Sequence, residues 1–175
     1  MNIIEASEKG KIDIVSQLIQ QDKSVLLTTT DLGMTPLHRV ARFGHIEIVR
    51  ELLDAGVKPT ITDARKWTPL HDAACEEESL FCLELLLRAG CPVDVKDVYG
   101  DTPLMVACTY SNLPSVAYLL KCGASVTTKN RRGLNALRCT EYQLNGIEQR
   151  KGSDWKGQTR ALQSIIAFIV EGNSR

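Results

Sequence analysis

The side chains that could do chemistry in this chain are three histidines and six cysteines. His71 and Cys75 lie four residues apart, so on one helix the imidazole could act as the base for a thiol nucleophile. No two cysteines have C-x-x-C spacing, and no cysteines and histidines have the spacing of a zinc site. The motifs G-x-x-x-x-G-K-[ST], G-x-G-x-x-G, H-E-x-x-H and G-x-S-x-G are absent as well. We therefore expect no enzyme, no metal site and no cofactor, and cysteines that serve as reduced, buried thiols.

The tetrapeptide around His71 recurs at a fixed spacing. Thr68-Pro69-Leu70-His71 follows Thr35-Pro36-Leu37-His38 by 33 residues and precedes Thr102-Pro103-Leu104-Met105 by 34. A degraded copy, Asn135-Ala136-Leu137-Arg138, comes 33 residues later. A spacing of about 33 that holds three times predicts a repeat array. The recurrence also explains His71 without catalysis.

Each copy is expected to begin a pair of helices. Thr35 is a good N-cap, proline suits the first helical position, and glycine suits the end, here Gly44 and Gly56. In the next copy Glu76-Glu77-Glu78 replaces the tight turn, and Ser79 is expected to cap the second helix. We predict a single domain over residues 1–175, with units at about 1–27, 28–60, 61–94, 95–127 and 128–175.

The last unit departs from the pattern. Its helices are expected at 134–140 and 159–171, with an insert near 141–158 whose Asn145-Gly146 pair favours a loop. One position in the turns between units is glycine in three copies, and Lys66 occupies the same position in the fourth. A left-handed backbone at Lys66 would cost about 1–2 kcal/mol.

Composition and charge narrow the function. An apolar content of 43% with 24% charged residues indicates a folded protein. The formal net charge is zero, yet residues 63–101 hold nine acids and four bases, whereas residues 121–160 hold nine bases and three acids. No run approaches about 18 apolar residues, and the N-terminus lacks the features of a signal peptide. We expect an intracellular protein, cytoplasmic or nuclear.

The residues resemble the ankyrin repeat family. The pattern of a hairpin turn, T-P-L-H and then A-x-x-G-H-x-E-I-V-x-x-L-L-x-x-G matches Thr35 through Gly56 almost throughout, and the resemblance covers the whole chain with imperfect end units. It implies an all-α solenoid with β-hairpin tips, in which the histidines tie neighbouring loops together. It also implies a non-catalytic adaptor or scaffold that binds a partner protein or peptide on a concave face. We expect it to be monomeric on its own and to have no small-molecule substrate.

The resemblance also implies which side chains contact the partner. The expected centre is Trp67 with Tyr99 and Phe43 with Tyr110, because interfaces favour large apolar anchors ringed by charge. In the alternative, Trp67 simply packs on the next hairpin. The full set of expected partner-binding residues is Leu32, Met34, Arg42, Phe43, Arg65, Trp67, Asp72, Glu76, Tyr99, Asp101, Tyr110, Arg131 and Arg132.

Two charged regions leave narrower alternatives open. Asp72 with Glu76-Glu77-Glu78 could bind a basic peptide, and Asp63-x-x-x-Trp67-Thr-Pro-Leu-His71-Asp72 is similar to ankyrin domains that read histone tails in chromatin. Other acidic positions of that pattern are lost in this chain. The basic C-terminal end fits an acidic protein, a nucleic acid or plain solvated surface, but no nucleic-acid motif is present.

Overall fold

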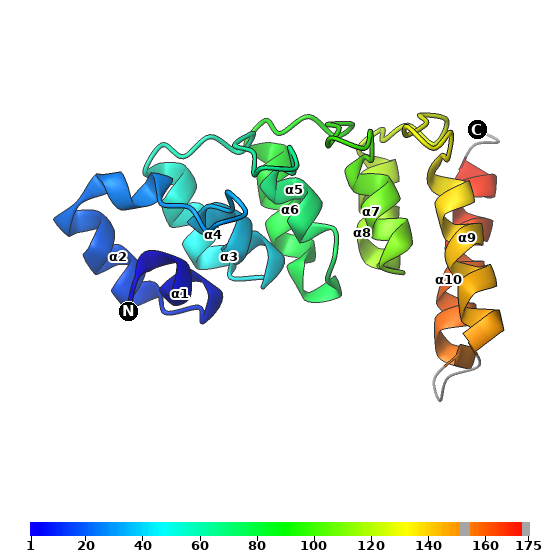
Figure 1. The fold of residues 1–175 in the computed structure, drawn as a ribbon, viewed down its shortest axis with the longest axis horizontal. Coiled ribbons are helices and arrows are strands. Elements are labelled where there is room, and N and C mark those ends of the chain that lie inside the picture. The colour runs from blue at the N-terminus through cyan, green and yellow to red at the C-terminus, as the bar shows by residue number, and fades with distance from the viewer. Residues whose placement is uncertain (151–154, 173–175) are drawn as a thin grey trace.

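The computed structural model describes residues 1–150 and 155–172, which form α-helices and two short 3-10 turns and contain no strand. The helices come in pairs that stack along the long axis, with the termini at opposite ends (Figure 1). The all-α solenoid that the repeats predict is therefore confirmed. The pairs are α1 (Ile3–Glu8) with α2 (Ile12–Gln21), α3 (Pro36–Arg42) with α4 (Ile46–Asp54), α5 (Pro69–Ala73) with α6 (Leu80–Arg88), α7 (Pro103–Thr109) with α8 (Leu113–Lys121), and α9 (Ala136–Arg150) with α10 (Trp155–Gly172). The 3-10 turns are η1 (Lys23–Leu27) and η2 (Glu77–Ser79).

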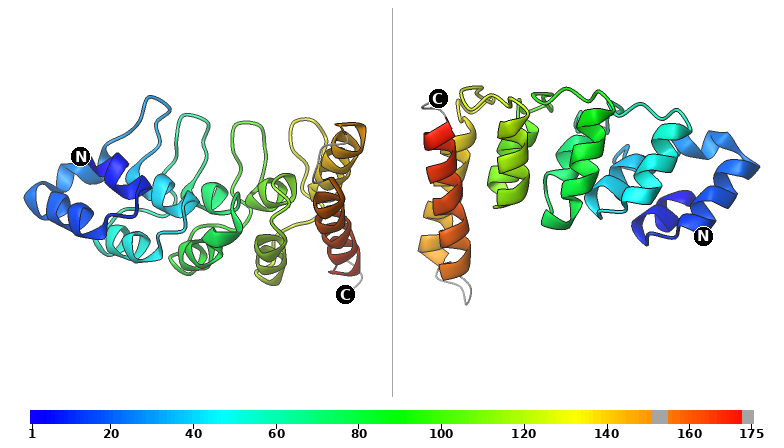
Figure 2. Two further views of the ribbon diagram at one scale, coloured as in Figure 1. Left: turned by 90° about the horizontal axis from the view of Figure 1, so that it is seen from below. Right: turned by 180° about the vertical axis from the view of Figure 1, so that it is seen from behind.

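The helices form two layers. The first helices α1, α3, α5 and α7 contact one another in sequence, and the second helices α2, α4, α6 and α8 form the layer beside them. The segments between units project as tips from the side of the first helices (Figure 2, left). This layout places the ends of the first helices and the tips on one side of the molecule.

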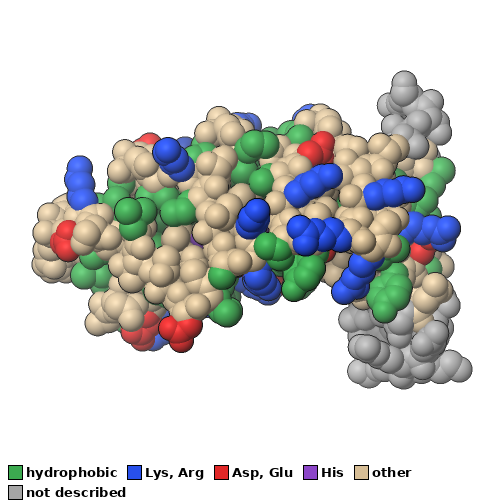
Figure 3. Space-filling model, turned by 45° about the horizontal axis from the view of Figure 1, so that its top comes forward, with side chains coloured by type: hydrophobic (Ala, Val, Ile, Leu, Met, Phe, Trp, Pro, Cys, Tyr) green, Lys and Arg blue, Asp and Glu red, His purple; other side chains and the backbone are tan. Residues whose placement is uncertain are grey.

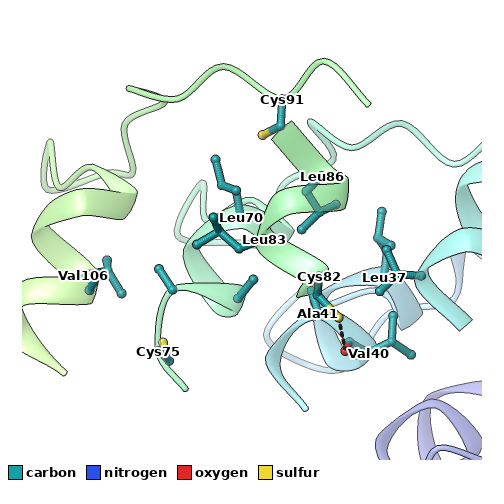
Figure 4. Close-up of a cluster of buried hydrophobic side chains, with 14 of the residues drawn as sticks. Leu37, Val40, Ala41, Leu70, Cys75, Cys82, Leu83, Leu86, Cys91 and Val106 are labelled. Carbon is teal, nitrogen blue, oxygen red and sulfur yellow. Dashed lines mark hydrogen bonds between the residues drawn. The ribbon is translucent and has the colours of Figure 1, made fainter. Parts of the chain in front are cut away.

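The core is a column of apolar side chains that runs through the stack. Leu37, Leu70, Leu83 and Leu86 are fully buried, and each packs between its own unit and a neighbour (Figure 4). Cys82 joins them as a small apolar residue, with its Sγ 4.0 Å from the carbonyl oxygen of Val40. Removing one such leucine side chain costs about 2–5 kcal/mol. Stability thus depends on contacts between units as well as within them.

The tips are tight turns closed by backbone hydrogen bonds. In the third unit the N–H of Asp63 donates to the carbonyl oxygen of Trp67 at 2.9 Å, and Asp97 and Asp101 repeat the bond one unit later at 3.1 Å. Lys66 has φ of 60°, which confirms the left-handed conformation expected there. The tips are hairpin turns without assigned strands.

Two local predictions are wrong. The loop expected near 141–158 is helical at both described ends, because α9 continues through Asn145-Gly146 to Arg150 and α10 already begins at Trp155. The good helix formers Gln143 and Leu144 precede that pair, and α10 packs along α9. Together these outweigh a glycine cost of about 1 kcal/mol. Residues 151–154 lie outside the described residues. Ser79 does not cap α6 through its side chain; its hydroxyl donates instead to the carbonyl oxygen of Arg42 at 2.6 Å.

Candidate partner-binding surface

The regular spacing of the T-P-L-H copies has a structural cause. The backbone N–H of Thr35 donates to Nδ1 of His38 at 3.2 Å, so the ring proton lies on Nε2, which is 3.0 Å from the carbonyl oxygen of Trp67. His71 repeats the arrangement, with Nε2 3.2 Å from the carbonyl oxygen of Asp101. Burial lowers the pKa of both histidines, which keeps them neutral. Each histidine therefore ties its helix to the next tip, and neither ring nitrogen is free to act as a base.

The thiol–imidazole pair that the sequence spacing allowed is not formed. The Sγ of Cys75 lies 3.5 Å from the backbone carbonyl oxygen of His71 rather than from its ring. Burial raises the pKa of the Cys75 thiol to about 12, so the nucleophilic thiolate is strongly disfavoured. Cys75 packs as a small core residue.

Trp67 is not the free anchor that the sequence suggested. Its indole N–H donates to the Asp97 carboxylate at 2.9 Å, and its ring stacks on His71 with 5.7 Å between centroids. The guanidinium of Arg65 covers the ring at 4.5 Å from its centroid. Trp67 is half-buried and packs on the next tip, as the alternative interpretation had it.

Two further candidates are buried rather than exposed. Asp72 is fully buried because α5 lies between α3 and α7. The guanidinium of Arg42 also lies 3.7 Å from its carboxylate. Met34 keeps only 6% of its surface exposed, and its Sδ lies 3.7 Å from a guanidinium nitrogen of Arg39. Neither side chain is therefore free for a partner: Asp72 is covered by neighbouring units, and Met34 is buried beside Arg39 of its own unit.

The remaining helix-end candidates, together with Arg39 beside them, form a surface across three units. We define the first-helix face as Arg39, Arg42, Phe43, Glu76 and Tyr110. Phe43 and Tyr110 expose 45% and 47% of their surface. The Arg39 guanidinium lies 5.3 Å from the Phe43 ring centroid, and that of Arg42 lies 6.0 Å from the Tyr110 ring centroid. Two partly exposed aromatic rings are thus held beside arginines.

Arg42 connects these units electrostatically. Its guanidinium nitrogens lie 3.7 Å from a carboxylate oxygen of Asp72 and 3.8 Å from one of Glu76. Among the described residues, neither carboxylate oxygen of Asp72 has a hydrogen-bond partner. Burial raises the pKa of Asp72 to about 7, and the nearby Arg42 opposes this rise. Asp72 is therefore a buried acid whose ionised form is only partly compensated.

The tip candidates lie on the outer edge of the molecule. Leu32 and Tyr99 expose 60% and 57% of their surface, and Arg65, Arg131 and Arg132 are exposed too. Asp101 is half-buried, and its carboxylate accepts a bond from the Asn130 side chain at 2.6 Å. Leu32 and the arginines are thus available to a partner, while Asp101 is engaged within the fold.

The sequence reading missed the residues that shape the tips. Oδ1 of Asp63, of Asp97 and of Asn130 each accepts two backbone N–H bonds from its own tip, at 2.8–3.0 Å. Thr30 takes the equivalent place in the first tip, with its hydroxyl 3.2 Å from the N–H of Met34. The signal was present, because these four positions recur at intervals of 33 or 34 residues. Asp63 is therefore a turn-forming residue.

The described residues hold no assembled metal or membrane feature. Within residues 1–150 and 155–172, no group of three or more His, Cys, Asp or Glu side chains is placed to hold a metal ion. None of the described helices is long and apolar enough to cross a bilayer.

Stacked helix pairs, projecting tips and histidines that link successive units define a helical repeat solenoid. A family model for ankyrin repeats, in three copies, matches residues 3–63 and 55–130. The chain belongs to the ankyrin repeat family. Ankyrin repeats are protein–protein interaction modules, and the chain carries that class of module.

Relatives with diverse overall roles share the array. The chain is 32% identical over 135 residues to palmitoyltransferase AKR1 of Lachancea kluyveri, which is 75% of this chain and 18% of that protein. It is 34% identical over 148 residues to SH3 and multiple ankyrin repeat domains protein 2 of Homo sapiens, covering 79% of this chain and 8% of that protein. It is 30% identical over 134 residues to neurogenic locus notch homolog protein 2 of Homo sapiens, covering 76% of this chain and 5% of that protein. The chain thus spans less than a fifth of each relative, so the activity of the whole protein does not carry over.

Proposed function

We propose that the chain is a non-catalytic adaptor or scaffold that binds a partner protein through the first-helix face, with Phe43 and Tyr110 as anchors. The observation that supports this most is the exposure of both rings on one side, each beside an arginine. Tyr and Arg are enriched among the residues that contribute most to protein interfaces, and Phe is enriched in interfaces as well.

The arrangement of Arg42 supports a binding surface that is already ordered. This side chain comes from α3, approaches Glu76 beside α5, and lies near the Tyr110 ring at the end of α7. Because it contacts groups from two other units, little side-chain entropy remains to be lost when a partner binds. We expect the partner to meet a surface whose shape changes little on binding.

The proposed partner surface differs from a histone-tail site. The narrower resemblance rests on Asp63, Trp67 and Asp72. Asp63 shapes its own tip, Trp67 bonds to Asp97, and Asp72 is buried beneath Arg42. We therefore place the partner on Phe43 and Tyr110. We also propose that the chain works inside the cell, where its five buried cysteines would stay reduced.

The test is affinity purification of the full chain from cells, followed by mass spectrometry, for wild type and Phe43→Ala/Tyr110→Ala. Losing two anchor rings should weaken partner capture by about 30-fold or more, since a strong anchor is worth about 2 kcal/mol. Phe81→Ala is the matched control, because Phe81 is 64% exposed but lies on α6 in the second-helix layer.

Thermal unfolding of each variant separates binding from folding. Equal capture by wild type and the double variant would overturn the proposal, as would an equal loss with Phe81→Ala.

A further inference from the structure

A second surface lies on the tips, which precede the first helices, whereas Phe43 and Tyr110 follow the ends of α3 and α7. The turn-forming residues of successive tips are Thr30, Asp63, Asp97 and Asn130. The residues two positions after them are Leu32, Arg65, Tyr99 and Arg132. All four side chains are exposed. The repeat therefore places an apolar, a cationic, an aromatic and a cationic side chain at equivalent points along one edge.

Backbone hydrogen bonds hold the tips side by side. The N–H of Ala64 donates to the carbonyl oxygen of Leu32 at 3.0 Å, and that of Val98 to Arg65 at 2.9 Å. The N–H of Arg131 donates to the carbonyl oxygen of Tyr99 at 2.8 Å. In each case the acceptor is the second tip residue itself. The edge is thus a continuous row with a fixed register.

Three of the acids in the tips, Asp63, Asp97 and Asp101, are engaged within the fold, whereas Asp31 of the first tip is exposed. Asp63 and Asp97 are buried, each bonds two backbone N–H groups of its own tip, and Asp97 also accepts the indole N–H of Trp67. Asp101 bonds the Asn130 side chain. These carboxylates are therefore already engaged and largely hidden from a partner.

The cations of the row point outward. We define the tip row as Tyr99 with the exposed bases Arg65, Lys66, Lys96, Lys129, Arg131 and Arg132. Of these bases, Arg65 alone has a described carboxylate within 4.0 Å, namely Asp63 at 3.4 Å. Lys96 and Lys129 hold equivalent places in consecutive tips. Lys and Arg side chains accordingly gather over the C-terminal half of this side of the molecule (Figure 3).

We infer that the tip row is a second interaction surface, which binds an acidic protein segment carrying an apolar side chain. Acidic side chains complement the unpaired cations, and Tyr99 offers an apolar surface between Arg65 and Arg132. One exposed ion pair contributes only about 0.2–1 kcal/mol, so several acids must act together. A nucleic acid fits less well, because surfaces that bind single strands stack bases on several aromatic side chains, and this row has Tyr99 alone.

The test uses the full chain and two fluorescein-labelled peptides, Glu-Glu-Glu-Leu-Glu-Glu-Glu and the same peptide with glycine in place of leucine. Fluorescence anisotropy should show binding that weakens by about tenfold or more between about 50 and 300 mM NaCl. Arg131→Glu/Arg132→Glu should weaken it by at least about tenfold. Arg50→Glu/Lys58→Glu changes the net charge equally at exposed positions outside the row and should have less than about a twofold effect.

Tyr99→Ala should weaken binding of the leucine peptide by about threefold to tenfold and leave the glycine peptide unchanged. Equal losses from the two charge-reversal variants would overturn the inference. So would tighter binding of an oligothymidylate with the same dependence on the row, which would mark a nucleic-acid surface.

Phe43→Ala/Tyr110→Ala separates this inference from the proposed function. Peptide binding should survive that change, because the tip row does not include either ring. If peptide binding is lost, the peptide contacts the first-helix face instead. If no peptide binds while partner capture still depends on Phe43 and Tyr110, only the tip-row inference fails.

Discussion

Replacing Asp72 by asparagine should make the protein more stable at neutral and alkaline pH. Asp72 is fully buried, and its carboxylate oxygens have no hydrogen-bond partner in the part of the chain that the structure describes. The Arg42 guanidinium approaches the carboxylate only to 3.7 Å. Burying a charge without full compensation costs free energy. Asparagine keeps the shape of the side chain and removes the charge.

The magnitude follows from the pKa of Asp72, which burial raises from 3.8 to about 7. At about 1.4 kcal/mol per pKa unit, this difference amounts to about 4 kcal/mol. Because the pKa is higher in the folded state, the free energy of unfolding is greatest below pH 3.8, where Asp72 is protonated in both states. It decreases as the pH rises from 3.8 to about 7. The advantage of Asp72→Asn should therefore grow by about 2–3 kcal/mol between pH 5 and pH 8.

Urea unfolding at several pH values measures this difference. Groups that titrate in both proteins cancel when the two free energies of unfolding are subtracted. Glu77→Gln, which neutralises an exposed acid in the same segment, is the matched control. A variant Asp72→Asn that is less stable than wild type at pH 8 would refute the reasoning. It would show that Arg42 stabilises the ionised carboxylate by more than its burial costs.

Three other outcomes follow from the structure, each measured by urea unfolding. Lys66→Gly should stabilise the protein by about 1 kcal/mol, because Lys66 has φ of 60°; a destabilised variant would contradict this. Trp67→Phe should cost about 1–3 kcal/mol, since it removes the indole bond to buried Asp97, and it should leave partner capture intact. In the Asp72→Asn background, stability should fall as the pH drops below about 6.5, because burial lowers the pKa of the two tip-linking histidines and the unfolded chain takes up protons first. A flat profile from pH 7 to 5 would contradict the neutral histidine bridges.

The repeat spacing predicted the parts of the fold that depend on local sequence. Proline after threonine starts the first helices, and the T-P-L-H histidines link neighbouring loops as the resemblance implied. The left-handed turn at Lys66 also followed from its alignment with glycines. Each of these features recurs in two or more copies, so the pattern itself carries the information.

Exposure was harder to predict, because it depends on what the adjacent unit places nearby. The sequence does not show what contacts Trp67 or Asp72. In the structure, Asp97 accepts the indole N–H of Trp67, and the guanidinium of Arg42 lies 3.7 Å from the Asp72 carboxylate. Phe43 and Tyr110 occupy helix ends where no neighbouring unit covers the ring fully. A repeat pattern fixes the place of a residue, whereas its environment is set by the particular side chains of two or three units.

The binding role of the first-helix face is tested most directly by amide hydrogen exchange of the full chain, alone and with its captured partner. We predict slower exchange in the complex at residues 42–44 and 110–112, which lie at or just after the ends of α3 and α7. Slower exchange confined to α4, α6 and α8, in the second-helix layer, would contradict the proposal.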